Sequence, residues 1–422
     1  MFKKITLHNG LRILTLPDKN TQAVTVLILV KTGSKYEKKE ENGISHFLEH
    51  MFFKGTKKRP SALAVAEVLD RAGGIYNAFT SQEDTGYFAK VEYSNFELAF
   101  DWVTDIFLNS LLPEEEIEKE KKVITEEINM IYDHPMSYIG VLWTKLLYGD
   151  QPAGWHIAGE KETVQKIDRQ KLINYWKSQY CPQNTLVTVA GNFNEKKAWY
   201  LIKKHFGELQ KGNPQNKPAI VENQNKPQCL LAERETDQTH LCLGVRAFNI
   251  FSKRRYGQDI LGAILGGMMS SRLFVEVREK LGLAYYISTE VEENPDTGFL
   301  ATRAGVDNQN VEKAILAILK EYKKISEKTI SPQELKKAKD NIKGKMALLL
   351  ESSDAQASFY AGQELLENKI LTPKQIFEKI NKVTRSDVLK IANEIFKPEK
   401  LNLAIIGPFK EKEKFEKILN NF

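Results

Sequence analysis

Asp84-Thr85-Gly86-Tyr87 occurs a second time in the chain, as Asp296-Thr297-Gly298-Phe299, 212 residues later. A second set of residues returns at a distance of 216, namely Pro182, Gly191 and Phe193 as Pro398, Gly407 and Phe409. Two spacings that agree within four residues are hard to obtain by chance. They predict a duplicated domain of roughly 200 residues, because internal similarity at a fixed distance marks a repeated structural unit.

The order of the expected elements indicates the fold class of each copy. The pattern predicts strands at 4–8, 11–16 and 23–30, a helix at 61–72 and a hairpin of 75–80 with 85–93. Helices then follow in a run, at 94–109, 113–132, 137–147 and 169–179, before a strand at 185–189 and a helix at 195–206. Hairpins that cluster, with helices that do not alternate with strands, favour an α+β fold in which a mostly antiparallel sheet packs against helices.

The length of 422 residues also predicts at least two domains, because one hydrophobic core seldom serves so long a chain. Residues 211–227 contain Pro214, Pro218 and Pro227 among Asn, Gln and Lys, which is typical of a linker. We therefore expect an N-terminal domain at 1–210, a linker at 211–227 and a homologous C-terminal domain at 228–422.

The composition is that of a globular protein, with 42% hydrophobic and 27% charged residues, and it excludes a collagen-like or broadly disordered chain. The net charge of +6 is spread without blocks of one sign, so no nucleic-acid partner is expected. Three cysteines without a C-x-x-C pair indicate neither a disulfide framework nor a cysteine zinc site. No apolar run approaches the roughly 20 residues of a bilayer crossing, and no targeting segment is recognised, so we expect a cytoplasmic protein without a membrane partner.

His46-Phe47-Leu48-Glu49-His50 carries the strongest chemical signal in the chain. On a helix that begins near residues 43–45, positions i, i+3 and i+4 share one face, so both imidazoles and the Glu49 carboxylate converge. Two imidazoles suit Zn²⁺, and a catalytic zinc takes a third protein ligand from elsewhere. Glu49 is placed to accept a proton from an attacking water as general base. The alternative is a chance pair of surface histidines without a function.

The third ligand is expected from the acidic helix at 113–132. Most of its carboxylates read as a solvated face, and the first few favour a helix N-terminus. Glu120 and Glu127 lie two turns apart on one face, so either or both could approach a metal. Glu126 points about 100° away and is the weaker candidate.

Taken together, these residues resemble the pitrilysin family of inverzincin metallopeptidases, which includes insulin-degrading enzyme and the β-subunit of the mitochondrial processing peptidase. The resemblance rests on the H-x-x-E-H motif, on its continuation Met51-Phe52-Phe53-Lys54-Gly55-Thr56, and on Glu127, 77 residues after His50. The length is similar to that of the short bacterial branch of the family.

The resemblance implies a zinc endopeptidase with one Zn²⁺ per chain. His46, His50 and Glu127 would be the metal ligands, Glu49 would activate water, and Glu120 would support the site from nearby. The strand Asn77-Ala78-Phe79-Thr80 is similar to the edge strand on which the family lays its peptide substrate by β-augmentation. The alternative, from the residues alone, is that Asn77 is simply a strand residue near a turn.

The second half supplies a further pair of candidates. Arg278 and Tyr285 resemble the arginine and tyrosine with which the family polarises the scissile carbonyl and stabilises the oxyanion. Without the resemblance they would be an ordinary helix-surface residue and an ordinary strand aromatic. The zinc positions are absent from this copy, because adding 212 to positions 46 and 50 leads to Gln258 and Gly262.

The resemblance also has a consequence for assembly. Long family members close a chamber from four such domains, and two domains correspond to half of that clamshell. We therefore expect a homodimer in which Arg278 and Tyr285 act on the partner chain's zinc, with unfolded peptides as substrates. A heterodimer with a related subunit, or a non-catalytic or processing-complex subunit that needs a different partner chain, is the alternative.

Overall fold

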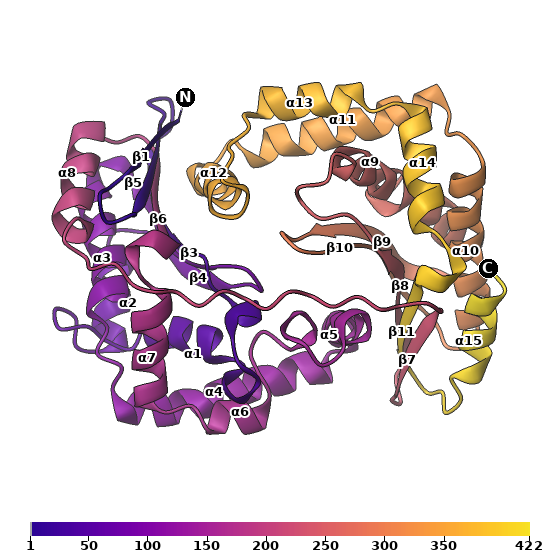
Figure 1. Ribbon diagram of the computed structural model, residues 1–422, viewed down its shortest axis with the longest axis horizontal. Helices are drawn as coiled ribbons and strands as arrows, with labels where there is room; N and C mark the ends of the chain where they lie inside the picture. Colours follow the sequence, from indigo (N-terminus) through magenta and orange to yellow (C-terminus); the bar gives the residue numbers. More distant parts are fainter. Residues whose placement is uncertain (1) are drawn as a thin grey trace. The chain divides into compact units, whose positions relative to one another are not determined.

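The computed structural model describes residues 2–422, which group into two compact units with one β-sheet each (Figure 1). The first unit comprises residues 2–129, Trp155–Pro218 and Leu348–Ile370. The second comprises Met130–Gly154, Ala219–Ala347 and Leu371–Phe422.

The first unit is built on a six-stranded sheet in the order β1-β2-β6-β3-β5-β4. Its strands are β1 (Lys3–Thr6), β2 (Arg12–Pro17), β3 (Ala23–Val30), β4 (Ile75–Thr80), β5 (Thr85–Glu92) and β6 (Thr185–Gly191). The β2–β6 pair is parallel, and the other neighbours are antiparallel. The central strand β3 is apolar at almost every position, so both of its faces need cover.

Helices supply that cover. They are α1 (Ile44–Met51), α2 (Ala62–Asp70), α3 (Phe96–Asn109), α4 (Glu114–Asp133, whose last four residues group with the second unit), α6 (Lys161–Gln165), α7 (Arg169–Gln179), α8 (Glu195–Phe206) and α12 (Ser353–Glu367). Val26 and Ile28 of β3 belong to the larger core, together with residues of α1, α3 and α8. Leu27 and Leu29 point to the opposite face and pack with α12.

The second unit repeats this topology without a counterpart of β1. Its five strands are β7 (Gln228–Glu233), β8 (Gln238–Arg246), β9 (Ala284–Glu293), β10 (Gly298–Asp307) and β11 (Leu401–Gly407), in the order β7-β11-β8-β10-β9. The β7–β11 pair is parallel and the remaining neighbours are antiparallel. The order is that of β2-β6-β3-β5-β4 in the first unit, so the predicted α+β fold with two homologous domains is confirmed.

The helices of the second unit are α5 (Pro135–Tyr148), α9 (Arg255–Gly266), α10 (Val311–Glu327), α11 (Pro332–Leu349, whose last two residues group with the first unit), α13 (Pro373–Lys382), α14 (Arg385–Ile395) and α15 (Glu413–Asn420). On one face of the sheet, Phe299 and Ala301 of β10 pack with Ile139, Leu142 and Trp143 of α5. Thus α5, which precedes the linker in sequence, completes the core of the second unit.

The units therefore combine segments from both halves of the chain. Residues 130–154 fall within the domain expected at 1–210 and residues 348–370 within the domain expected at 228–422, whereas the contacts group each with the other unit. The physical reason is that the amphipathic pattern of α5 and α12 shows an apolar face without showing which sheet it covers.

The repeated Asp-Thr-Gly segments occupy equivalent hairpin turns. Thr85 and Thr297 are both buried just after the turn, at the start of β5 and directly before β10 respectively. A side chain at Gly86 would collide with the ring of Phe79, and one at Gly298 would collide with the carbonyl oxygen of Phe248. Close approach of neighbouring groups therefore favours glycine at both positions.

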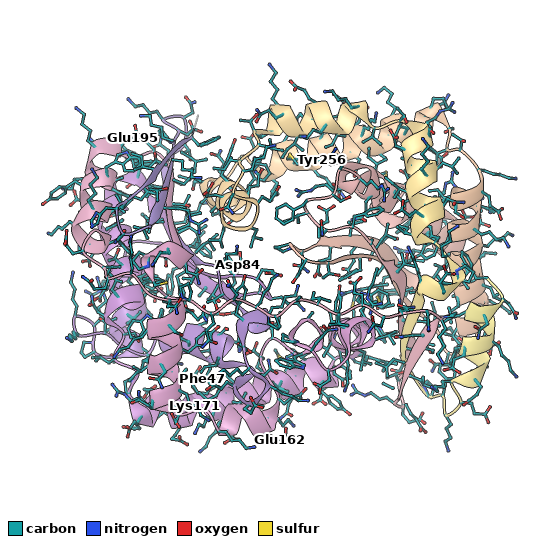
Figure 2. All side chains as sticks on the ribbon, in the orientation of Figure 1. Phe47, Asp84, Glu162, Lys171, Glu195 and Tyr256 are labelled. Carbon is teal, nitrogen blue, oxygen red and sulfur yellow. The ribbon has the colours of Figure 1, made fainter. Side chains whose placement is uncertain are left out.

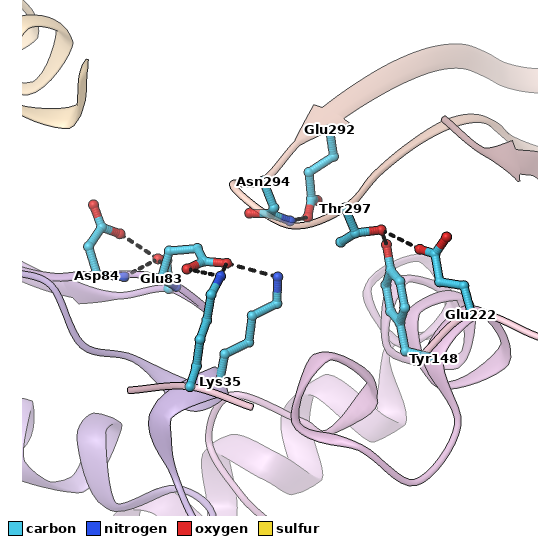
Figure 3. A network of polar contacts seen from close by, with 10 residues as sticks. Lys35, Glu83, Asp84, Tyr148, Glu222, Glu292, Asn294 and Thr297 are labelled. Carbon is cyan, nitrogen blue, oxygen red and sulfur yellow. Dashed lines mark hydrogen bonds and ion pairs between the residues drawn. The ribbon is translucent and has the colours of Figure 1, made fainter. Parts of the chain in front are cut away.

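The expected linker at 211–227 has no helix or strand before β7, but it is held on both sides of the change of unit after Pro218. In the first unit, Glu83 accepts hydrogen bonds from the ammonium groups of Lys35, at 2.9 Å (Figure 3), and of Lys217, at 2.5 Å. In the second unit, Glu222 accepts a hydrogen bond of 2.8 Å from Thr297 (Figure 3). Within residues 2–422, no helix combines the length and apolar character that crossing a membrane requires.

Candidate metal centre

Helix α1 presents two chemically different faces. Phe47, which Figure 2 labels, is fully buried, as are Leu48 and Met51, and they fix the helix in the core of the first unit. His46 and His50 project from the other side, with their rings in an edge-to-face arrangement and their centroids 4.5 Å apart. The predicted sharing of one helix face is therefore present.

Helix α4 brings a carboxylate to these rings. Glu127 Oε1 lies 3.6 Å from His46 Nε2, and Glu127 Oε2 lies 3.6 Å from His50 Nε2. The two Nε2 atoms are 3.3 Å apart. In the part of the chain that the structure describes, His46, His50 and Glu127 are the one group of three or more His, Cys, Asp or Glu residues whose ligand atoms gather, within 4.8 Å, as a metal site requires. Two imidazoles and one carboxylate suit zinc, so the donor set fits the predicted metal.

The electrostatics of this site favour a cation. Burial lowers the pKa of His46, but the negative charges of Glu127, Glu49 and Glu37 outweigh it and raise the pKa above its ordinary value. The interaction with His46 lowers the pKa of Glu127, and partial burial opposes that shift. The same negative charges that favour an imidazolium would favour a bound divalent ion.

Glu120 orients one of the two histidines. Its Oε1 accepts a hydrogen bond of 2.7 Å from His50 Nδ1, so His50 Nε2 is the nitrogen left for a metal. Its Oε2 lies 2.6 Å from the ammonium nitrogen of Lys54. Burial raises the pKa of Glu120, but the bonds from His50 and Lys54 and their charges hold it below its ordinary value. Glu120 thus contacts His50 and lies outside the group formed by His46, His50 and Glu127.

We expect Glu120→Gln to weaken zinc binding by about 10- to 100-fold, because an amide can keep the bond from His50 only by presenting its NH₂ to Lys54. The affinity should be measured by competition with a chromogenic chelator. Glu118→Gln is the control, because Glu118 is an exposed carboxylate of the same helix that pairs with Lys121. Equal zinc affinity in the two variants would show that Glu120 does not contribute to zinc binding.

The strand expected to bind substrate, 77–80, contacts Glu49, the expected general base. Thr80, at the end of β4, donates a hydrogen bond of 2.6 Å to Glu49 Oε2. β4 is one of the two edge strands of its sheet, with Asn77 and Phe79 exposed and Ala78 buried. The proximity of Thr80 to Glu49 is a feature that spacing along the chain does not reveal.

Arg278 and Tyr285 lie in the second unit, whereas the three potential ligands lie in the first. Arg278 is part of a π-helix, Phe274–Lys280, and its guanidinium stacks over the ring of Phe274 at 4.7 Å. Tyr285 is 74% exposed on the edge strand β9. A π-helix is rare and frequently accompanies functional positions. The side chains of Arg278 and Tyr285 are both accessible to solvent, and neither belongs to the hydrophobic core.

The counterpart of α1 in the second unit has no histidine at the two positions that correspond to His46 and His50. Gln258 and Gly262, the residues expected at the two histidine positions, lie on α9. Gln258 is buried, and its side chain accepts a hydrogen bond of 2.8 Å from the backbone N–H of Phe248. A side chain at Gly262 would meet Val291 of the neighbouring strand. The second copy therefore uses this helix for packing.

Comparisons with known proteins agree with this arrangement. A protein-family model described as "Insulinase (Peptidase family M16)" matches residues 12–160. A second model, described as "Peptidase M16 inactive domain", matches residues 166–342. The zinc protease YmxG of Bacillus subtilis is 36% identical over 97% of this chain and 98% of its own. A zinc protease of Rickettsia felis is 33% identical over 95% of this chain and 96% of its own.

A crystal structure of a protease from Helicobacter pylori matches with a TM-score of 0.89 at 27% identity and covers 97% of this chain and 99% of that one. Matches of this extent confirm the resemblance drawn from the His46–His50 motif. The chain belongs to the M16 peptidase (insulinase) family.

Proposed function

We propose that the protein is a zinc-dependent endopeptidase that cleaves unfolded peptides inside a chamber formed by two chains. The observation that carries the proposal is the gathering of His46, His50 and Glu127 beside an acidic side chain, Glu49, that is not part of the ligand group. The names of the bacterial relatives, which are zinc proteases, support the same chemistry.

The residues have separate tasks. His46, His50 and Glu127 would hold Zn²⁺, which when bound supplies a Lewis acid that polarises a carbonyl and makes water acidic enough to lose a proton near neutral pH. Glu49 accepts that proton and later returns it to the leaving amine. Thr80 occupies one oxygen of Glu49, so the other oxygen is the one free to act as base.

The peptide would bind along β4. An edge strand has unpaired backbone groups, and a peptide in extended form pairs with them regardless of its side chains. β4 carries no charged residue, whereas the other edge strands of the two sheets do, with Lys3 and Lys4 on β1, Glu233 on β7, and Glu290, Glu292 and Glu293 on β9. Charged side chains protect an edge from pairing, so their absence favours β4 as the docking strand.

Arg278 and Tyr285 would donate hydrogen bonds to the substrate carbonyl oxygen and stabilise the oxyanion that develops there. We assign this pair to the partner chain of a homodimer, because one chain carries half of the four domains expected for the chamber. The family resemblance supports this assignment, together with the accessibility of both side chains.

The alternative is a subunit that needs a different partner chain for activity, or one that has lost catalysis altogether. Loss of catalysis in such a subunit should be accompanied by loss of metal ligands, and this chain keeps His46, His50 and Glu127 together. The assembly question is therefore the one that an experiment has to decide.

Mixing Glu49→Gln chains with Arg278→Ala chains tests the shared site. Each variant alone should be inactive, whereas a mixed dimer has one site with an intact Glu49 and an intact Arg278. After subunit exchange at equal amounts, we expect about a quarter of the wild-type rate, since half of the dimers are mixed and each has one complete site.

The exchange itself must be shown independently, with a mass tag on one of the two variants. If tagged mixed dimers form and no cleavage returns, Arg278 does not act across the dimer. Activity that is unaffected in the Arg278→Ala chain alone would remove that residue from the site.

A further inference from the structure

The start of helix α1 lacks the side-chain cap that helices commonly have. Its N-cap residue is Gly43, with φ at 97° and no side chain to accept a hydrogen bond. Any larger residue there would also collide with the carbonyl oxygen of Ala158. The first N–H groups of a helix have no partner within the helix, and leaving them unpaired in a buried place is costly.

Glu37 satisfies these groups from the preceding loop. Its Oε2 accepts from the backbone N–H of Gly43 at 2.8 Å, and its Oε1 accepts from that of Ser45 at 2.8 Å. The side-chain amide of Asn42 donates a third hydrogen bond, of 3.0 Å, to Glu37 Oε2. Glu37 is 5% exposed, and its burial raises the pKa of the carboxyl although the hydrogen bonds from Ser45, Gly43 and Asn42 oppose that shift.

The same first turn is tied to the rest of the unit. The hydroxyl of Ser45 is hydrogen-bonded at 2.7 Å to that of Tyr175 on α7, which is also 2.7 Å from the hydroxyl of Thr32 after β3. All three of these residues are buried. A fully satisfied polar network of this kind fixes the position of the groups that it joins.

We propose that Glu37 is a positioning residue of the metal centre, which holds the first turn of α1 so that His46 and His50 face Glu127. The inference rests on the proposed metal centre. Ser45, whose N–H Glu37 binds, is directly followed by His46, and the second histidine is one helical turn further on the same face. A shift of this turn would move both Nε2 atoms relative to Glu127 on α4, whereas Glu37 itself does not touch any of the three.

An ordinary helix cap would account for the same bonds, but it would have a different consequence. A cap contributes to the stability of the fold and has no particular effect on a ligand elsewhere. A positioning residue also changes the affinity for the ligand in protein that remains folded. Zinc affinity therefore separates the two roles, and it does so without reference to peptide cleavage.

The test is the zinc affinity of Glu37→Gln in the full chain, measured by competition with a chelator at a temperature where circular dichroism shows the variant to be folded. Gln has one acceptor oxygen where Glu37 uses two, so one of the N–H groups of Gly43 and Ser45 loses its partner. We expect the affinity to fall about 10-fold or more, as for other groups that orient metal ligands.

Two controls match the change. Asp387→Asn removes a carboxylate that accepts from Thr384 at the start of α14, in the second unit, and should lower stability without changing zinc affinity. Glu40→Gln removes the charge of an exposed residue in the same loop and should change neither. Unchanged zinc affinity in folded Glu37→Gln would overturn the proposal.

If Glu37→Gln does not fold, Glu37→Asp keeps the charge and withdraws the carboxylate by one methylene. We then expect an intermediate loss of zinc affinity, and wild-type affinity in this variant would equally overturn the proposal. A protein that binds zinc in a Glu37-dependent way but cleaves no peptide would disprove the proposed function and leave this inference intact.

Discussion

Peptide cleavage by Glu49→Gln should fall by about 10²- to 10⁴-fold, the range that general-base catalysis contributes. Zinc should remain bound at the wild-type level, because the ligand group consists of His46, His50 and Glu127, and Glu49 is instead hydrogen-bonded to Thr80. The measurement is zinc content by atomic emission together with the initial rate on an unfolded fluorogenic peptide. Loss of rate with zinc retained identifies the base separately from the ligands.

Glu126→Gln is the matched control for that substitution. Glu126 is an exposed carboxylate next to Glu127, and the change from acid to amide is the same. It should leave both the zinc content and the rate unchanged. Full activity of Glu49→Gln with zinc still bound would remove Glu49 from the role of base.

A chain that ends at residue 210 should fail to form a cooperatively folded domain. The first unit includes residues 348–370, and α12 covers a sheet face formed by Leu14, Leu16, Leu27, Leu29 and Leu186. Without α12 these side chains would be exposed to water, which costs a free energy of about 25 cal/mol per Å² of apolar surface. We expect a broad thermal transition and binding of a hydrophobic dye in place of a sharp unfolding step.

A pair of leucines in the full chain tests the same packing. Leu365 on α12 is fully buried, and Leu365→Ala should lower the free energy of unfolding by about 2–5 kcal/mol. Leu348, the first residue of the segment 348–370, is 78% exposed. The free energy of unfolding of Leu348→Ala should stay within about 0.5 kcal/mol of that of the wild type. A cooperatively folded chain of residues 1–210, or equal effects of the two substitutions, would contradict this account of the first unit.

The repeat, the element order and the face shared by His46 and His50 could be predicted because each depends on spacing along the chain. Strand 23–30 was predicted with the bounds that it has, and the helices at 94–109 and 169–179 agree with α3 and α7 to within two residues. Local periodicity is sufficient for such features, since it decides which side chains share a face.

The remaining features depend on contacts between distant segments. Residues 35–41 are mostly charged, yet Lys35 and Glu37 are buried because Glu83 and the first turn of α1 provide partners for them. The ion pair of Lys54 with Glu120 depends on such a contact as well, although Lys54 stands within the continuation of the zinc motif. The assignment of α5 and α12 to sheets could not be read from their amphipathic patterns either.

We propose that His46, His50 and Glu127 hold the zinc on which peptide cleavage depends. The most direct measurement follows zinc content and cleavage of an unfolded peptide together, in the wild type and in His50→Ala, before and after treatment with a chelator and re-addition of zinc. We predict one zinc per chain in the wild type, loss of cleavage on chelation, its return with zinc, and neither zinc nor cleavage in His50→Ala. Cleavage that persists in metal-free protein, or full zinc content in His50→Ala, would contradict the account.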